Sequence, residues 1–342
     1  MNPFERRRLG RSQIELPVLG MGGAPLGNHF LEIADATADD TLAAAWEAGV
    51  RYFDTSPWYG RGLSEMRMGR GLYKRPRADF ILSTKVGRIF RPPADPVAFD
   101  ASDRKWPLGL KFEHYHDYTY AGIMRAYEDS LMRLGMNRID VLIIHDLDFA
   151  NFGSEAMVTA HLNNLATSGW RALAELKSHG CIGAIGGGVN RLGTIPRFVD
   201  LMPLDFFLVA TPYSLAEQPV LDEEFPLCQR NGISAVIGTV FASGILATGA
   251  VPGAKYNYRD PTPAEANRIL RIETICRSFD VPIAAAALQF PLHHPCVASV
   301  IPGAFAPEHV HANVELMRCE VPNELWSALK REGLLRADAP TP

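Results

Sequence analysis

The segment IDVLIIHD at residues 139–146 is a short apolar run, rich in β-branched side chains, that ends in a histidine and an aspartate. Apolar runs of this length, without polar alternation, are typical of strands that are covered on both faces, as in parallel sheets. Seven further runs of this kind occur along the chain, and each is followed by a stretch with helical spacing. They cover residues 18–23, 51–56, 80–86, 182–189, 206–212, 233–240 and 298–303.

The segments between these runs predict the crossover helices of a parallel sheet. Thr37, Ser64 and Thr262 are expected to cap three of these helices, because a hydroxyl at the start of a helix can accept a hydrogen bond from a free backbone N–H. The predicted helices cover residues 39–48, 64–73, 120–134, 168–179, 221–230, 262–278 and 307–317.

Eight strand–helix units predict an α/β fold, a (β/α)₈ TIM barrel with long loops at its C-terminal face, in one domain over residues 1–342. A doubly wound open sheet is the alternative. Its phosphate-binding fingerprint, GxGxxG after the first strand, is not matched by MGGAPLG at 21–27, where the glycines stand in another order. The barrel is therefore favoured.

Two connections, at about 87–119 and 147–167, are longer than ordinary strand–helix loops. Both follow strands at the C-terminal face, where loops build the active sites of barrel enzymes, so we expect them to shape a substrate site. The segment 6–17 is expected to form a hairpin that closes the opposite end. Polar residues on the two long connections include Arg88, Asp103, Lys105, His114, His116, Asp148 and Asn151.

The composition narrows the class of protein. The net charge of -4 and the absence of basic clusters beyond Arg6, Arg7 and Arg8 argue against nucleic acid and membrane surfaces as partners. The five cysteines include no CxxC pair, which argues against a zinc site and a disulfide framework. No signal-peptide pattern or apolar run of membrane-spanning length occurs, so a cytoplasmic protein is expected. The oligomeric state is left open.

Four reactive side chains are predicted to meet at one mouth of the barrel. Asp54, Lys85 and His145 end three consecutive strands, and Tyr59 lies in the loop after the first of them. Charged groups at a barrel mouth lose hydration unless they pair, so three from neighbouring strands favour a functional site over unrelated rim ion pairs. An ammonium beside a tyrosine is expected to lower the phenol's pKa and make it a proton carrier, with the carboxylate holding the lysine and the histidine orienting the reacting oxygen.

Four segments resemble the aldo-keto reductase superfamily: FDTSPWYG (53–60), STKVG (83–87), IDVLIIHD (139–146) and VIPGAFAPEHVHAN (300–313). The resemblance covers nearly the whole chain. It implies a barrel oxidoreductase that uses a nicotinamide cofactor and no metal. Carried over to this sequence, the family's catalytic tetrad falls on Asp54, Tyr59, Lys85 and His145.

The same resemblance implies a set of cofactor contacts. The family's adenosine segment commonly has a lysine and an arginine that grip a 2′-phosphate, and Gly303 and His309 stand near those positions here. NAD is therefore expected as the cofactor, with NADP as the alternative. The expected cofactor-binding residues are Gly22, Asn190, Phe241, Ser243, Gly244, Gly303, His309 and Asn313.

Three further stretches, IHDLDFANFG (144–153), AIGGGVN (184–190) and GTVFASGILATG (238–249), resemble a bacterial branch of the superfamily. That branch oxidises aldoses such as L-fucose and includes pyridoxal 4-dehydrogenase. The expected function is oxidation of a cyclic hemiacetal to a lactone, with an aldose or pyridoxal as the small-molecule substrate. A non-catalytic regulatory subunit and a metal-dependent hydrolase are the alternatives of other classes. The expected substrate contacts are Trp58, His114, Asp146 and Asp148.

Overall fold

Eight parallel strands form the central sheet of the computed structural model, which describes residues 1–100, 106 and 108–342. Their order in the sheet is the order of the chain, as expected when each strand is followed by a crossover to its neighbour. The strands are β3 (Met21–Gly22), β4 (Tyr52–Asp54), β5 (Ile81–Val86), β8 (Val141–Ile144), β9 (Ala184–Val189), β10 (Phe206–Val209), β11 (Ser234–Ile237) and β12 (Val297–Val300).

Backbone hydrogen bonds join the first and last strands and close the sheet into a barrel. Leu19 bridges Val300 and Gly22 bridges Gly303, both in parallel register. The amide of Gly20 donates to the carbonyl of Val300 at 2.9 Å. The predicted (β/α)₈ barrel and all eight predicted strands are confirmed.

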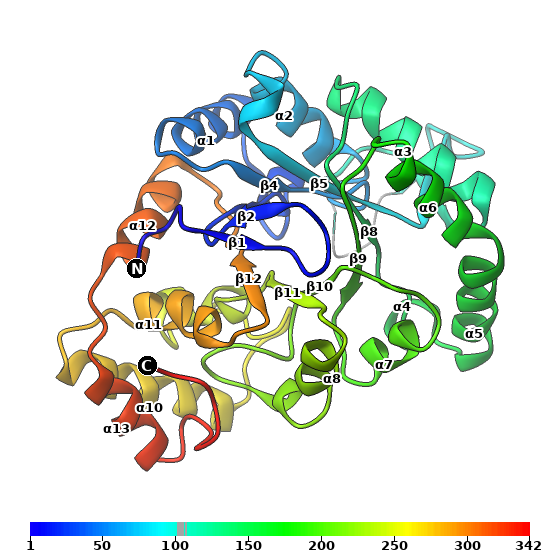
Figure 1. Ribbon diagram of the computed structural model, residues 1–342. Coiled ribbons are helices and arrows are strands. Elements are labelled where there is room, and N and C mark those ends of the chain that lie inside the picture. The colour runs from blue at the N-terminus through cyan, green and yellow to red at the C-terminus, as the bar shows by residue number, and fades with distance from the viewer. Residues whose placement is uncertain (101–105, 107) are drawn as a thin grey trace.

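Helices surround the barrel on its outer side (Figure 1). The longer helices bury apolar side chains in the core around the strands, which are apolar on both faces because their inner side chains fill the barrel. The helices are α1 (Asp35–Glu47), α2 (Leu63–Leu72), α3 (Tyr120–Leu134), α4 (Phe149–Phe152), α5 (Glu155–Asn164), α6 (Trp170–Ser178), α7 (Thr194–Val199), α8 (Glu224–Arg230), α9 (Ile245–Thr248), α10 (Pro263–Ser278), α11 (Ile283–Gln289), α12 (Pro307–Arg318) and α13 (Asn323–Arg331).

The seven predicted helices are present, but only one of the three expected caps is correct. Thr262 caps α10 in a reciprocal pair with Glu265. Thr37 lies inside α1, and Ser64 lies inside α2, where its hydroxyl donates to the carbonyl of Gly23 at 2.7 Å. The remaining helices were not predicted, because they are short or lie in segments that the sequence pattern assigned to loops.

The predicted N-terminal hairpin consists of β1 (Arg6–Arg8) and β2 (Glu15–Pro17), which pair in antiparallel register. In Figure 1 it lies in front of the centre of the ring of helices. Leu9 and Leu16 are fully buried and pack on the inward-facing side chains Tyr52, Val141 and Phe206. The hairpin therefore closes the N-terminal end of the barrel.

The two long connections have structure of their own at the opposite end. The first contains an antiparallel hairpin of β6 (Arg88–Arg91) and β7 (Glu113–His116). The second contains α4 and α5. Both start where β5 and β8 end, so they stand at the C-terminal mouth of the barrel. Asp103 and Lys105 lie outside the described residues.

Candidate active site

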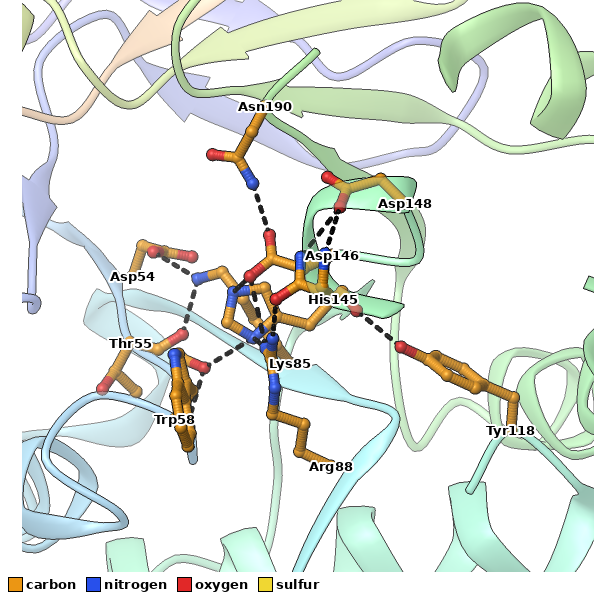
Figure 2. A network of polar contacts seen from close by, with 12 residues as sticks. Asp54, Thr55, Trp58, Lys85, Arg88, Tyr118, His145, Asp146, Asp148 and Asn190 are labelled. Atoms are coloured by element: carbon orange, nitrogen blue, oxygen red, sulfur yellow. Dashed lines mark hydrogen bonds and ion pairs between the residues drawn. The ribbon is translucent and has the colours of Figure 1, made fainter. Parts of the chain in front are cut away.

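An ion pair between neighbouring strands forms the floor of the mouth. Lys85, on β5, donates to Asp54 Oδ2 at 2.7 Å and to the carbonyl of Thr55 at 2.8 Å, and only 1% of its side chain is exposed. Ser83 donates to the other carboxylate oxygen of Asp54 at 2.7 Å. β4 and β5 pair in parallel register, which brings both side chains to the same end of the sheet. Figure 2 shows the lysine between Asp54 and Thr55. The pair is desolvated and held from both sides.

Tyr59 stands above this pair, in the loop between β4 and α2. Lys85 Nζ lies 4.8 Å from the centroid of the Tyr59 ring. Burial raises the pKa of the Tyr59 phenol well above its usual value, and the negative charge of Asp54 raises it further. The expected lowering of this pKa by Lys85 is therefore wrong. The reason is that Asp54 neutralises the ammonium, while burial disfavours the phenolate.

His145 faces Tyr59 from the end of β8, and the two ring centroids are 6.1 Å apart. Its Nδ1 lies 3.0 Å from the Ser56 hydroxyl and 3.0 Å from Arg88 Nη1. Its Nε2 lies 3.2 Å from Asp146 Oδ2. The Tyr118 hydroxyl donates to the backbone carbonyl of His145 at 2.8 Å (Figure 2). The imidazole is thus fixed from several elements around the mouth.

Two adjoining cavities open at this mouth. The first has a volume of about 360 Å³ and the second of about 480 Å³, and both are lined by His29 and Tyr258. Three of the four predicted catalytic residues, Tyr59, Lys85 and His145, line the first, and Asp54 holds the lysine from behind. Other side chains that line the first cavity include Trp58, Trp106, Asp146, Asn151, Asn190, Arg191 and Asn257.

Comparison with known proteins agrees with this geometry. The Aldo/keto reductase family profile matches residues 18–331. The chain belongs to this family. It is 39% identical to pyridoxal 4-dehydrogenase of Microbacterium luteolum, over 97% of this chain and 98% of that protein. It is 38% identical to D-threo-aldose 1-dehydrogenase of a Pseudomonas species, over 96% of each chain.

The fold agrees with a solved structure of the same family. The holo form of an aldo-keto reductase from Bacillus halodurans superposes with a TM-score of 0.74 at 27% identity, covering 98% of both chains. This aldo-keto reductase is accordingly an enzyme, an oxidoreductase that uses a nicotinamide cofactor and acts on a small molecule. The non-catalytic and hydrolase alternatives are set aside on this ground.

The second cavity has the composition that a dinucleotide requires. Both apolar and polar residues line it, and it shares Ala24, His29 and Tyr258 with the first cavity. Six of the eight expected cofactor residues line it: Phe241, Ser243, Gly244, Gly303, His309 and Asn313. Asn190 lines the first cavity instead, where its amide donates to Asp146 Oδ1 at 2.7 Å. The residues present therefore fit a nicotinamide dinucleotide.

Three predicted contacts line neither cavity. Gly22 lies at the seam of the barrel, where a Cβ would stand 2.7 Å from the carbonyl oxygen of Ile301, so its role is close packing. His114 lies behind Trp58, with ring centroids 4.5 Å apart. Asp148 caps α4 and accepts hydrogen bonds from the backbone and side chain of Asn151. These three contacts therefore stay predictions, which the lining of the two cavities does not support.

The sequence pattern did not identify Asn257 and Tyr258 as site residues. Both have left-handed backbone torsions, with φ of 46° and 69°, in a connection far along the chain from the tetrad. Arg88 was expected only as one of several polar residues on a long loop. Its position three residues after Lys85 could have indicated a site residue, because a side chain so soon after the end of β5 stays near the same mouth.

Among the residues that the structure describes, no three His, Cys, Asp or Glu side chains are grouped so that they could hold a metal ion. Within the same part of the chain, every helix is too short or too polar to cross a membrane.

Proposed function

We propose that this aldo-keto reductase oxidises the C1 hydroxyl of a cyclic aldose such as L-fucose to the corresponding lactone. The observation that supports the proposal most is the lining of the first cavity. Asp146, Asn151, Asn190 and Asn257 bring hydrogen-bonding groups to the space around Tyr59 and His145. A sugar ring presents several hydroxyls, and a site built to pair them selects by their configuration.

Tyr59 and His145 hold the reacting oxygen in this proposal. The C1 hydroxyl transfers its proton to Tyr59 Oη, while His145 Nε2 donates a hydrogen bond to the same oxygen. Lys85 lies against the Tyr59 ring, and Asp54 holds the lysine in that position. The bound nicotinamide supplies the acceptor for the hydride that leaves C1. Loss of one proton and one hydride from a hemiacetal gives the lactone.

Trp58 and Trp106 wall the same cavity. Trp106 is 3% exposed, and its indole N–H has no hydrogen-bond partner among the described residues. Buried indole donors normally have a partner, so a substrate oxygen is a natural acceptor for this N–H.

The test is a substrate panel assayed with the purified enzyme. We expect L-fucose, D-arabinose and L-galactose to differ sharply in kcat/KM, with a lactone as the first product by NMR and with simple aliphatic alcohols almost inert. Strong oxidation of pyridoxal, with no oxidation of any sugar, would contradict the aldose assignment. Absence of cofactor reduction with every compound would contradict the proposed chemistry as a whole.

Pyridoxal is the second candidate substrate, and one structural feature favours it. The ring centroids of His29 and Tyr59 lie 4.9 Å and 5.5 Å from that of Trp106, and the Tyr258 centroid lies 5.8 Å from that of His29. Aromatic groups at this spacing suit a flat heteroaromatic ring. The hemiacetal form of pyridoxal would lose a proton and a hydride in the same way as a sugar.

The cofactor is proposed to be NAD in preference to NADP. No lysine or arginine of the described chain lines the second cavity. A 2′-phosphate bound there would lose hydration without a charge-assisted partner. His309 is the nearest substitute, and its Nδ1 already accepts a hydrogen bond from the Phe305 amide at 3.3 Å.

The ratio of kcat/KM for the two cofactors checks this preference. We expect a higher value with NAD by at least 10-fold, since a charge-assisted hydrogen bond contributes about 1.5–3 kcal/mol. A higher value with NADP would contradict the proposal. Measuring His309→Ala under the same conditions would then show whether that imidazole binds the phosphate.

A further inference from the structure

Arg88 lies beneath the imidazole of His145, and only 3% of its side chain is exposed. Its Nη1 lies 3.0 Å from His145 Nδ1 and 3.3 Å from Asp146 Oδ2. Its Nη2 donates to Asn151 Oδ1 at 2.7 Å, and its guanidinium carbon lies 4.8 Å from the Trp58 ring centroid. Figure 2 shows the guanidinium approaching His145 from the side away from Asn190. Arg88 does not line the first cavity itself, but all four residues that it contacts do.

The contact with Nδ1 decides which imidazole nitrogen carries the proton. A guanidinium has N–H donors and no acceptor, so the nitrogen that faces it must offer a lone pair. His145 Nδ1 is therefore the acceptor, and the proton of the neutral ring is on Nε2. Nε2 is the nitrogen on the side of Asp146, which lines the first cavity.

The other neighbour of Nδ1 does not make this choice. The Ser56 hydroxyl lies 3.0 Å from Nδ1, and a hydroxyl can either donate to a lone pair or accept from an N–H. With Ser56 alone, both neutral tautomers of His145 would be satisfied. Arg88 thus requires a lone pair on Nδ1, and the Asp146 carboxylate, which only accepts, favours the same tautomer from the Nε2 side.

We propose that Arg88 is a positioning residue that holds His145 in the tautomer with its proton on Nε2, ready to donate to the substrate oxygen. This inference rests on the proposed role of His145 in the reaction. Among the described residues, the titratable and charged groups that face the imidazole include Tyr59 after β4, Arg88 on β6 and Asp146 after β8. Of these, Arg88 is the group at Nδ1, and Asp146 is at Nε2.

The arginine is itself held firmly enough to act in this way. Asn151 fixes one arm of the guanidinium, and Asp148 orients Asn151 through its side-chain amide at 2.9 Å. A buried cation that is paired and hydrogen-bonded has little freedom to turn away. Asp148, which had been expected to contact substrate, therefore acts through this chain of contacts.

The tautomer is measured directly by NMR on enzyme labelled with ¹⁵N-histidine. The chain has ten histidines, and the signals of His145 are those lost in His145→Gln. In the wild-type enzyme we expect the pattern of a protonated Nε2 and an unprotonated Nδ1. In Arg88→Met we expect a substantial share of the Nδ1-protonated form. Arg91→Met is the matched control on the same strand, because Arg91 is 60% exposed and pairs with Glu113; its His145 signals should be unchanged.

Kinetics provide the second readout. Arg88→Met should lower kcat by at least about 10-fold, within the ~10²–10⁴-fold range of general acid–base catalysis, with cofactor affinity unchanged. Arg88→Lys, which keeps a donor without an acceptor, should recover part of kcat and the Nε2-protonated pattern.

Two results would overturn the inference. One is an Nδ1-protonated His145 in the wild-type enzyme, which tests the inference even if Arg88→Met does not fold. The other is an unchanged tautomer in a folded Arg88→Met. Full activity of His145→Gln would instead refute the proposed role of His145 in the reaction, and the NMR result on Arg88 would be unaffected by it.

Discussion

At the scale of single residues, Tyr59 combines a buried phenol with an ammonium that is already paired. Burial and the charge of Asp54 raise its pKa, so in the free enzyme the group is a protonated phenol at neutral pH. A phenol of this kind can donate a proton for reduction directly. Oxidation requires it to accept a proton, so the oxidation rate should rise as the pH increases through the alkaline range.

Tyr59→Phe should reduce turnover by roughly 10²–10⁴-fold or more, because the variant lacks only the hydroxyl that exchanges the proton. Cofactor affinity, measured by fluorescence titration, should stay close to that of the wild-type enzyme. A purified, folded variant with nearly normal kcat would show that another group moves the proton.

In Asp54→Asn, the rise of the oxidation rate with pH should occur at a lower pH than in the wild-type enzyme. The carboxylate raises the pKa of Tyr59, so its removal lowers that pKa, and the released charge of Lys85 acts in the same direction. The shift should be about one pH unit or more. Asp39→Asn is the control, since Asp39 pairs with Arg70 on the helical surface. A rise that stays at the wild-type pH in Asp54→Asn would contradict the electrostatic coupling.

At the scale of elements, Gly87 is the turn that links two parts of the site. It joins β5, which bears Lys85, to β6, which starts with Arg88. Its φ is +106°, and a Cβ there would stand 2.2 Å from Cε1 of Tyr118. Tyr118 is fully buried and donates to the carbonyl of His145, so this contact connects the turn to the histidine.

Gly87→Ala should therefore lower both stability and kcat. The strained torsion and the overlap with Tyr118 together should cost about 2–5 kcal/mol of unfolding free energy. Gly135→Ala is the matched control: Gly135 has a φ of +62° but has no atom within 4 Å of its Cβ position, so only the cost of the left-handed torsion, about 1 kcal/mol, is expected. Denaturant unfolding and kcat of both variants give the comparison, and equal losses would refute the role of Tyr118.

At the scale of the whole molecule, the active site lies at the C-terminal end of the barrel, and the N-terminal hairpin closes the other end. The tetrad and both cavities lie at the C-terminal mouth, while Leu9 and Leu16 of the N-terminal hairpin pack into the other end. Stability and activity should therefore respond separately to changes at the two ends.

Leu16→Ala should destabilise the protein by about 2–5 kcal/mol, because it removes a fully buried side chain and leaves a cavity under the barrel. The kcat of the folded variant should match the wild type. Met132→Ala, at a side chain that is 82% exposed, should change the unfolding free energy by less than about 0.5 kcal/mol. A large loss of kcat in folded Leu16→Ala would argue against the separation of the two ends.

The sequence by itself determined the elements and their order. Eight apolar runs were enough for the strands, because residues covered on both faces must be apolar wherever they occur in the chain. The same reasoning placed Asp54, Lys85 and His145 at one mouth, since parallel strands end on the same side. Capping residues were less reliable: Ser64 has the chemistry of a cap, yet its hydroxyl serves the backbone of Gly23.

Only the tertiary structure decided where side chains point and what surrounds them. His114 and Asp148 belong to loops at the C-terminal mouth, but neither lines the first cavity. Tyr258 lines that cavity although its loop is far from the tetrad along the chain. The raised pKa of Tyr59 and the acceptor role of His145 Nδ1 likewise depend on burial and on Arg88. The physical reason is that strand order follows from local patterns of hydrophobicity, whereas direction, desolvation and hydrogen-bond partners arise when distant segments pack together.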